Sequence, residues 1–330
     1  MINILEELHG AGSNGGLLLL VAATCMLASV LAAVLWLSSM SKPLGSDVSV
    51  GLRREEKGSS SGNLAGAGDD RVLSATKFSK FSVTKVESIS HNTKLIRFEI
   101  PATRTLGLPI GRHISVRAEI DGNMVIRAYT PTSRSDTTGH FDLLIKSYEM
   151  GKLSQHMHAL KPGDSMEVRG PVGRFKYVKN AFPCMGFVGG GTGLTPCLQV
   201  IRCILEGPEG EGDTTNFILL FQNRTEADIL LRQDLEDLAK NFPTRLHVVF
   251  LLSNPSSLAW GDGNQIAKFG TLAGKPQHLK GYVNAAVVKA LLTPSLCPFI
   301  GICGPSGFND CVKNLLTSEG HELEKSVYIW

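Results

Sequence analysis

The period of the hydrophobic pattern changes near residue 178, and this change divides the folded part of the chain into two fold classes. Residues 81–148 alternate apolar and polar side chains in five short runs, FSVTKVESIS, KLIRFEI, HISVRAEI, NMVIRAYT and FDLLIKSY. A period of two is typical of antiparallel strands that bury one face. Asp121-Gly122, between two of these runs, predicts a tight hairpin because Gly tolerates a positive φ. We therefore expect an antiparallel barrel over residues 79–177.

From residue 178 onward, short apolar runs alternate with amphipathic segments of helical period. The apolar runs read CMGFVG, NFILLFQN, LHVVFLLSN and CPFIGICG, and the helix after the second is expected over residues 226–242. An insertion at 261–280 has no role that the sequence indicates. This order predicts an α/β domain with a parallel sheet over residues 178–330. Ligands of such sheets bind at the carboxyl ends of strands, so motifs at those ends are candidate sites.

Composition excludes several classes of function. The chain has 330 residues, 43% of them apolar and 19% charged, which is enough for two globular domains. Its net charge of +3 is small and its basic residues are not grouped with aromatic ones, so we expect no nucleic-acid partner. Seven cysteines without a Cys-x-x-Cys spacing argue against a disulfide framework and against a zinc or iron–sulfur site. We therefore expect no metal and a reducing compartment.

The N-terminal part predicts a membrane anchor. After a flank of residues 1–16, residues 17–37 (LLLLVAATCMLASVLAAVLWL) carry no charge and are long enough to cross ~30 Å of hydrocarbon as a helix. A cleaved signal peptide is the alternative, but the apolar run exceeds the usual ~7 to 15 residues and no Lys or Arg precedes it. Residues 38–78 are rich in Gly, Ser and charge, which predicts a flexible linker.

The charges that flank the transmembrane helix predict its orientation. Lys42, Arg53, Arg54 and Lys57 follow the apolar run, whereas acidic residues precede it. Positive charge favours the cytoplasmic side, so we expect a membrane-anchored protein with its large C-terminal part in the cytosol. The endoplasmic reticulum and the mitochondrial outer membrane are both open as its location.

Arg-Ala-Tyr-Thr-Pro-Thr-Ser at 127–133 ends the fourth alternating run. Alternation places Arg127 and Tyr129 on one face, where a guanidinium can hold a diphosphate and an aromatic ring can lie near a flavin. Thr130 then offers a short hydrogen bond. The alternative is an exposed Arg and a half-buried Tyr before a Pro turn, and the local sequence does not separate the two interpretations.

Gly151-Lys152-Leu153-Ser154 opens a predicted helix, LSQHMHAL. Free backbone amides, a hydroxyl and the helix dipole at such a start favour a phosphate. An ordinary capped helix is the alternative. Further on, Gly170-Pro171-Val172-Gly173 is expected to break the chain before the second domain.

Two further motifs lie at predicted strand ends in the α/β domain. Gly-Gly-Gly-Thr-Gly-Leu-Thr-Pro at 189–196 would let backbone amides approach a pyrophosphate, although it is not the G-x-G-x-x-G fingerprint, and a structural turn is the alternative. Cys-Gly-Pro-Ser-Gly at 303–307 would bring the sulfur of Cys303 close to a bound ring. Nothing in sequence near Cys303 indicates a thiolate, and a buried Cys with no role in binding is the alternative.

These four motifs, with IDGNMVIRAYTP at 120–131 and ILLRQDLEDL at 229–238, resemble the cytochrome b5 reductase branch of the ferredoxin-reductase-like flavoproteins. The resemblance extends from about residue 79 to residue 330. It implies an FAD-binding Greek-key barrel followed by a nicotinamide-nucleotide domain, with the flavin between them. It also implies hydride transfer from NADH to FAD, and then single-electron transfer to cytochrome b5 or a similar acidic haem protein.

The resemblance also implies roles for individual residues. Those implied at the reacting rings are Thr130, Lys146 and Cys303. Those implied to contact FAD are Arg127, Ala128, Tyr129, Thr130, Leu144, Lys146, Tyr148, Lys152, Leu153, Ser154 and Thr195. Those implied to contact the nicotinamide nucleotide are Gly190, Gly191, Gly193, Asn254, Cys303, Gly304 and Pro305, with Trp330 where the family usually ends in an aromatic residue.

The sequence departs from the family pattern at three places. Ala128 stands where many relatives have Pro, and the loop after Tyr148 is shorter than usual. Asn254 stands where relatives that prefer NADH carry an acidic residue. A carboxylate there would bond the ribose 2′-OH and repel a 2′-phosphate, so we expect NADH as the main donor, with NADPH possible.

Two alternatives to this function remain open at the level of sequence. The electron acceptor can be a quinone, a ferric chelate or another haem protein instead of cytochrome b5. The chain can also be a membrane tether that binds a partner and no cofactor. That hypothesis, however, does not explain why both domains carry loops of the kind that bind phosphate.

Overall fold

The computed structural model describes residues 72–257, 259–262, 265–272 and 274–330. All of these belong to one compact unit, residues 48–330. The expected anchor at 17–37, its flank and most of the expected linker lie outside the described residues. Within the described part, no helix combines the length and the apolar character that a membrane span requires.

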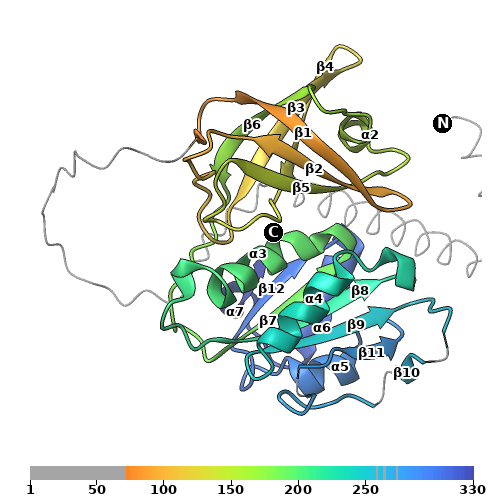
Figure 1. Cartoon of the computed structure of the whole chain (residues 1–330). Helices are drawn as coiled ribbons and strands as arrows, with labels where there is room; N and C mark the ends of the chain where they lie inside the picture. The colour runs from red at the N-terminus through yellow and green to blue at the C-terminus, as the bar shows by residue number, and fades with distance from the viewer. Residues whose placement is uncertain (1–71, 258, 263–264, 273) are drawn as a thin grey trace, which may run out of the picture. The chain divides into compact units, whose positions relative to one another are not determined.

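The first domain is a single antiparallel sheet of six strands, with the short helix α2 (Lys152–His158) beside it (Figure 1). Its strands are β1 (Ser79–Ser90), β2 (Thr93–Glu99), β3 (His113–Ile120), β4 (Asn123–Tyr129), β5 (His140–Lys146) and β6 (Ser165–Val172). The order across the sheet is β4-β3-β6-β1-β2-β5. Strand β6, the last in the chain, lies between β3 and β1. A Greek key needs such a return of a late strand to lie beside the first one, and a simple meander lacks it. The edge strands are β4 and β5.

Alternation forms these strands as expected. Ile96 and Phe98 of β2 are fully buried, and Phe98 stacks on Phe141 at 5.1 Å between ring centroids. Arg97, between them, points away from this core and pairs with Asp142 at 2.8 Å. The predicted hairpin is confirmed, because Asp121 and Gly122 have φ values of 53° and 71° and β3 pairs directly with β4. Such φ values fit a type I′ turn.

The predicted chain break at Gly170-Pro171-Val172-Gly173 is wrong for its first three residues. They form the end of β6, and His113 still pairs with Val172. A Cβ at position 170 would lie 3.0 Å from a methyl group of Ile114, so glycine eases the packing at this point of the sheet. The chain leaves the strand only at Gly173, where φ is 101°.

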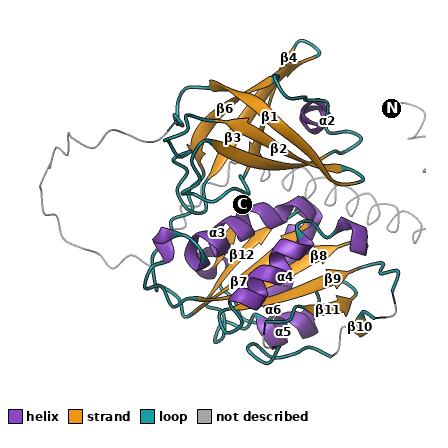
Figure 2. Ribbon diagram, viewed as in Figure 1, coloured by secondary structure: helices purple, strands orange, loops and turns teal. Residues whose placement is uncertain are grey.

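The second domain is a parallel sheet of seven strands covered by helices on both faces (Figure 2). Its strands are β7 (Cys184–Gly190), β8 (Asn216–Asn223), β9 (Leu246–Leu252), β10 (Gly261–Asp262), β11 (Gln277–Lys280), β12 (Phe299–Cys303) and β13 (Val327–Ile329), in the order β10-β11-β9-β8-β7-β12-β13. The helices are α3 (Leu194–Leu205), α4 (Arg232–Asn241), α5 (Ala285–Leu291), α6 (Ser306–Ser318) and the short α7 (Leu323–Ser326).

Alternate residues of the central strands enter two separate hydrophobic cores. Phe187 of β7 packs with residues of α3 and α4, whereas Val188 packs with residues of α5 and α6. Both side chains are fully buried. This is why the central strands read as continuous apolar runs and not as alternating ones.

One feature of this domain differs from expectation, and the structure adds another where the sequence made no prediction. The helix expected over 226–242 is split into a short 3-10 turn, Glu226–Asp228, and α4, because Leu231 adopts a left-handed conformation with φ of 51°. The insertion at 261–280 adds β10 and β11 to the edge of the sheet, where β11 pairs with β9. Edge strands and their turns carry too few apolar residues to be evident from periodicity.

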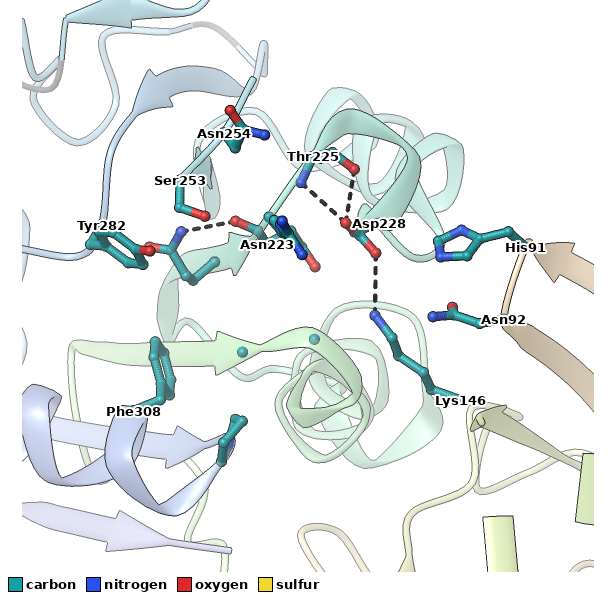
Figure 3. Close-up of a pocket in the computed structure, with 15 residues that line it drawn as sticks. His91, Asn92, Lys146, Asn223, Thr225, Asp228, Ser253, Asn254, Tyr282 and Phe308 are labelled. Carbon is teal, nitrogen blue, oxygen red and sulfur yellow. Dashed lines mark hydrogen bonds and ion pairs between the residues drawn. The ribbon is translucent and has the colours of Figure 1, made fainter. Parts of the chain in front are cut away.

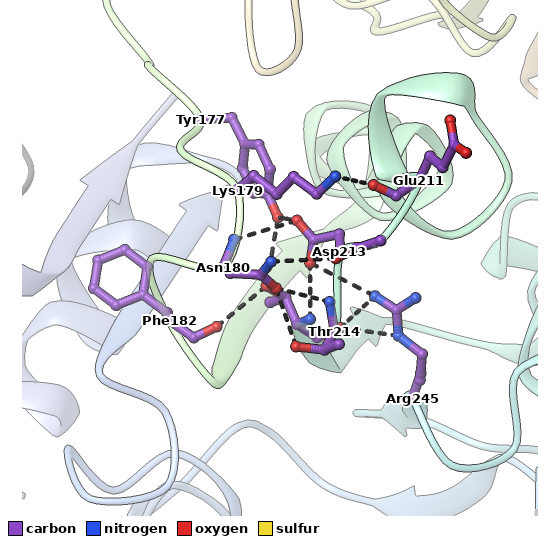
Figure 4. A network of polar contacts seen from close by, with 10 residues as sticks. Tyr177, Lys179, Asn180, Phe182, Glu211, Asp213, Thr214 and Arg245 are labelled. Atoms are coloured by element: carbon purple, nitrogen blue, oxygen red, sulfur yellow. Dashed lines mark hydrogen bonds and ion pairs between the residues drawn. The ribbon is translucent and has the colours of Figure 1, made fainter.

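A buried carboxylate ties the connection between the domains to the second sheet (Figure 4). The Asp213 side chain is fully buried and accepts hydrogen bonds from the Tyr177 hydroxyl (2.6 Å) and the Thr215 amide (2.8 Å), with Arg245 3.8 Å away. Burial opposes ionisation of Asp213, but the hydrogen bonds from Tyr177, Thr215 and Asn180 outweigh it and lower the pKa of this carboxyl. Tyr177 and Asn180 belong to the connecting segment, so the network fixes its course.

Candidate functional site

The carboxyl ends of β7 and β12 meet at the point where the strand order reverses. Strands β8 and β9 lie on one side of β7, and β12 lies on the other. Parallel sheets bind ligands at such a switch point. The glycine loop after β7 and the Cys303 loop after β12 touch there, because a Cβ on Gly193 would lie 1.9 Å from the carbonyl oxygen of Cys303. The two sequence motifs are therefore brought together as one structure.

The glycines of these loops have different roles. A Cβ on Gly190 or Gly304 would lie 3.2 Å or 2.4 Å from the ring of Phe308, so both glycines make room for that ring. Gly191 has φ of 55°, and a Cβ there would meet nothing within 4 Å. Its backbone is thus open on the side where a pyrophosphate can approach, so the loop fits a nicotinamide nucleotide.

A cavity of about 600 Å³ opens beside these loops. Its volume lies within the range of small-molecule sites. The lining residues that the sequence predicted are Lys146, Gly190, Gly191, Asn254 and Pro305. The lining residues that it missed are His91, Asn92, Gln222, Asn223, Arg224, Thr225, Asp228, Ser253, Tyr282 and Phe308 (Figure 3).

An ion pair joins the two domains at the wall of this cavity (Figure 3). The Nζ atom of Lys146, at the end of β5, lies 3.3 Å from Oδ1 of Asp228. Asp228 also accepts hydrogen bonds from the Thr225 hydroxyl (2.8 Å) and amide (3.2 Å). Burial opposes ionisation of Asp228, but Thr225 and Lys146 outweigh it and lower the pKa of the carboxyl. Lys146 is thereby held facing the nucleotide cavity.

The predicted residues of β4 lie on the exposed edge of the first sheet. Arg127 and Ala128 are exposed, Tyr129 is half-buried and Thr130 is buried. The Arg127 guanidinium donates to the carbonyl oxygen of Ile126 (2.7 Å), and among the described residues it has no carboxylate partner. Burial raises the pKa of Tyr129 to about 12, so its hydroxyl remains a neutral hydrogen-bond donor. An exposed guanidinium beside a neutral phenol fits a diphosphate-bearing cofactor.

The loop before α2 uses its polar groups internally. The Ser154 hydroxyl donates to the Gly151 carbonyl (2.8 Å) and accepts from the Tyr148 amide (3.3 Å). Leu153 is buried in the core of the first domain, so only its backbone is available to a ligand. Lys152 is exposed and pairs with Asp121 at 3.0 Å. An exposed pair of this kind is weak, which leaves Lys152 able to exchange Asp121 for a phosphate.

Three other predicted residues lie where the domains meet. Leu144 is buried and packs with the core residues of α3, and the Thr195 hydroxyl donates to the carbonyl of Thr192 (3.2 Å). The Tyr148 hydroxyl lies 3.3 Å from the Thr192 hydroxyl and so connects the two domains. All three side chains already have partners within the protein.

The Cys303 thiol is held neutral. Burial raises its pKa to about 11, and no basic side chain opposes this effect. A neutral thiol is a contact surface and not a nucleophile at physiological pH. The Trp330 indole packs against the same core as Cys303, its N–H donates to the Gly111 carbonyl (2.9 Å) and its ring lies 5.3 Å from that of Phe175.

Some of the missed lining residues lie at strand ends. Asn223 and Arg224 come at and after the carboxyl end of β8, and Ser253 comes after that of β9. The rule that ligands bind at these ends predicts them once the strand order is known. Tyr282 follows β11, which the sequence did not predict as a strand, and Phe308 lies in the first turn of α6, so neither carried such a signal.

Comparisons with known proteins agree on both domains. The protein-family model for the oxidoreductase FAD-binding domain matches residues 80–177, and the family model for the oxidoreductase NAD-binding domain matches residues 187–314. A protein of Lodderomyces elongisporus named NADH-cytochrome b5 reductase 1 is 40% identical over 258 residues, which are 78% of this chain and 79% of that protein. A protein of the same name from Dictyostelium discoideum is 38% identical over 253 residues, 76% of this chain and 81% of that protein.

A solved structure shows the same arrangement of domains. The cytochrome b5 reductase domain of Ulva prolifera nitrate reductase superimposes with a TM-score of 0.69 at 31% identity. The superposition covers 79% of this chain and all of that one.

Proposed function

We propose that this chain, which belongs to the cytochrome b5 reductase family of FAD- and NAD-binding oxidoreductases, is a membrane-anchored reductase that passes electrons from NADH through FAD to cytochrome b5. One observation carries the proposal. The interlocked loops of Gly193 and Cys303 border a cavity in the nucleotide domain, and Lys146 of the FAD domain reaches into the same cavity. A nucleotide bound there lies between the two domains.

The chemistry requires a carrier that accepts a hydride and releases electrons singly, and FAD supplies this when bound. The protein supplies position. Gly190 and Gly191 offer backbone amides to the nucleotide pyrophosphate, while Phe308 fixes the path of the loop behind them. The neutral thiol of Cys303 and the backbone of Gly304 border the nicotinamide without placing a charge beside it.

The FAD domain holds the cofactor through side chains. Arg127 and Lys152 are exposed cations on neighbouring parts of this domain and bind the FAD diphosphate. Tyr129, at the end of the same strand, and Thr130, directly after it, would orient the flavin. Lys146, held by Asp228 at the cavity wall, would lie beside the bound nucleotide.

Cytochrome b5 is the acceptor that the names of the relatives indicate. The full chain loaded with FAD should reduce purified cytochrome b5 in the presence of NADH, followed as the change in haem absorbance. A matched reaction with a quinone or a ferric chelate is the control. If either control acceptor is reduced much faster than cytochrome b5, the acceptor assignment is wrong, although the flavin chemistry stands.

The membrane anchor rests on residues 17–37 and on the cations that follow them. These support a cytosolic catalytic part on the endoplasmic reticulum or the mitochondrial outer membrane. The full chain should sediment with membranes after a carbonate wash, and a chain that begins at residue 72 should not. Recovery of both in the soluble fraction would contradict the anchor.

A further inference from the structure

One end of the nucleotide cavity is built by the carboxyl ends of β8 and β9. The backbone N–H of Asn254 donates to the backbone carbonyl of Arg224 (2.8 Å), and the backbone N–H of Ser253 donates to that of Asn223 (3.1 Å). These bonds hold the two strand ends side by side, and all four residues line the cavity. Figure 3 shows Asn223, Ser253 and Asn254 gathered at this end.

An aromatic ring flanks the same end. Gln222, at the end of β8, donates to the Gly281 carbonyl (3.2 Å) and accepts from the Val283 amide (2.9 Å). These two bonds pin the residues on either side of Tyr282, whose ring is 68% exposed and lines the cavity. An exposed aromatic ring beside a cavity offers a stacking surface for a planar base. This end is therefore suited to the adenosine part of a nucleotide.

The hydrogen-bond donors at this end lack acceptors. Asn223 is 7% exposed, and its Nδ2 atom is buried without a hydrogen-bond partner. Arg224 is exposed, and within the described part of the chain no acceptor engages its guanidinium. A buried donor without a partner is unfavourable unless a ligand supplies the acceptor.

The nearby carboxylates, in contrast, are all engaged. Asp228 is bonded to Thr225 and Lys146. Glu226 accepts from the backbone amides of Ser256 (2.9 Å) and Ser257 (3.1 Å) and does not line the cavity. Among the described lining residues the only carboxylate is that of Asp228, whose charge is paired with Lys146, whereas the ionised Glu226 lies outside the lining.

We infer that Arg224 is the principal ligand of a 2′-phosphate on the adenosine ribose, so that NADPH is bound as well as NADH. The side-chain amides of Asn254 and Asn223 supply further donors, and a guanidinium is well matched to a phosphate monoester. This inference rests on the proposed function, since it assigns the specificity of the same nucleotide site. It adds Arg224, which none of the sequence motifs contains.

The test uses two probes that differ by one phosphate, 2′,5′-ADP and 5′-AMP, titrated calorimetrically into the FAD-loaded full chain. The wild-type protein should bind 2′,5′-ADP at least as tightly as 5′-AMP. Arg224→Gln should weaken 2′,5′-ADP binding by about tenfold or more, since one charge-assisted contact is lost, and should change 5′-AMP binding by less than about twofold. Asn254→Asp should weaken 2′,5′-ADP selectively, because it adds a repulsive carboxylate.

Arg104→Gln is the matched control, because it removes the same charge from an exposed position of the first domain that does not line the cavity. It should leave both affinities unchanged. Two outcomes would overturn the inference. One is an equal loss of affinity for the two probes in Arg224→Gln. The other is wild-type binding of 2′,5′-ADP that is more than about tenfold weaker than that of 5′-AMP. Flavin content and bleaching by NADH, measured on the same samples, separate this outcome from failure of the proposed function.

Discussion

The two domains prepare their halves of the site in different ways. In the nucleotide domain the backbone forms the site, because Gly193 lies against Cys303 and the loop glycines make room for Phe308. In the FAD domain the predicted contacts are side chains on an exposed edge strand, such as Arg127. Substitutions in the loops of the nucleotide domain should therefore disturb folding. Substitutions on the exposed strand of the FAD domain should change only the affinity for the cofactor.

The largest effect is expected for Gly193→Ala. The new Cβ would lie 1.9 Å from the Cys303 carbonyl, so one of the two loops must move, at a cost of about 3 kcal/mol or more in the free energy of unfolding. Gly191→Ala is the matched control, because its Cβ meets nothing and only its positive φ costs about 1 kcal/mol. Urea unfolding measures both. Equal losses would mean that the loops do not interlock.

A smaller loss is expected for Asp213→Asn, which breaks the network that anchors the connecting segment. Replacing one of the two buried acceptor oxygens by an NH₂ donor, with loss of the charge, should cost about 2 to 4 kcal/mol. Because folding lowers the pKa of Asp213, its contribution is full above the ordinary carboxyl value of about 3.9 and is lost as the pH falls below it. The variant should therefore lose less stability than the wild type as the pH falls from about 5 towards about 2.

The exposed Asp237→Asn on α4 is the control for that comparison, since it removes one carboxylate from the surface of the same domain. It should leave the stability and its pH dependence nearly unchanged. If Asp213→Asn behaves like this control, the buried network does not stabilise the fold.

Arg127→Ala tests the FAD domain. Loss of a charge-assisted contact to the diphosphate should weaken FAD binding by about 1.5 to 3 kcal/mol, measured by the quenching of flavin fluorescence. The stability of the FAD-free protein should not change, because the side chain is exposed. Arg104→Ala is the control at another exposed position. Unchanged retention of FAD would defeat the assignment of Arg127.

The smallest effect is expected for the contact between the domains. A double-mutant cycle on Lys146→Ala and Asp228→Ala should give a coupling of about 1 kcal/mol, since the pair is largely but not fully buried. The cycle also removes the separate contribution of Thr225 to Asp228. A coupling of zero would mean that the cavity does not depend on this ion pair.

Much of the fold was predictable from local patterns. The alternation in β1 to β5 and the turn at Asp121-Gly122 depend on residues that are adjacent in sequence, and the structure confirms them. The break at Leu231 was not predictable, because its surroundings read as a continuous helix and the left-handed residue carries no mark in the sequence.

The candidate site was predictable only in part, for a different reason. The glycine and Cys303 loops each follow an apolar strand, so each can be read from its own segment. Arg224 and Tyr282 meet Asn254 only through the order of the strands in the sheet, which periodicity does not specify. The Ser154 hydroxyl was expected to face a phosphate but bonds Gly151, because the tight turn before α2 folds it inward.

The most direct test of a hydride path between the two domains is an anaerobic titration of the FAD-loaded full chain with NADH, followed by the visible absorbance of the flavin. We predict stoichiometric bleaching of that absorbance at one NADH per FAD. Retention of FAD with a spectrum that NADH leaves unchanged would contradict the account.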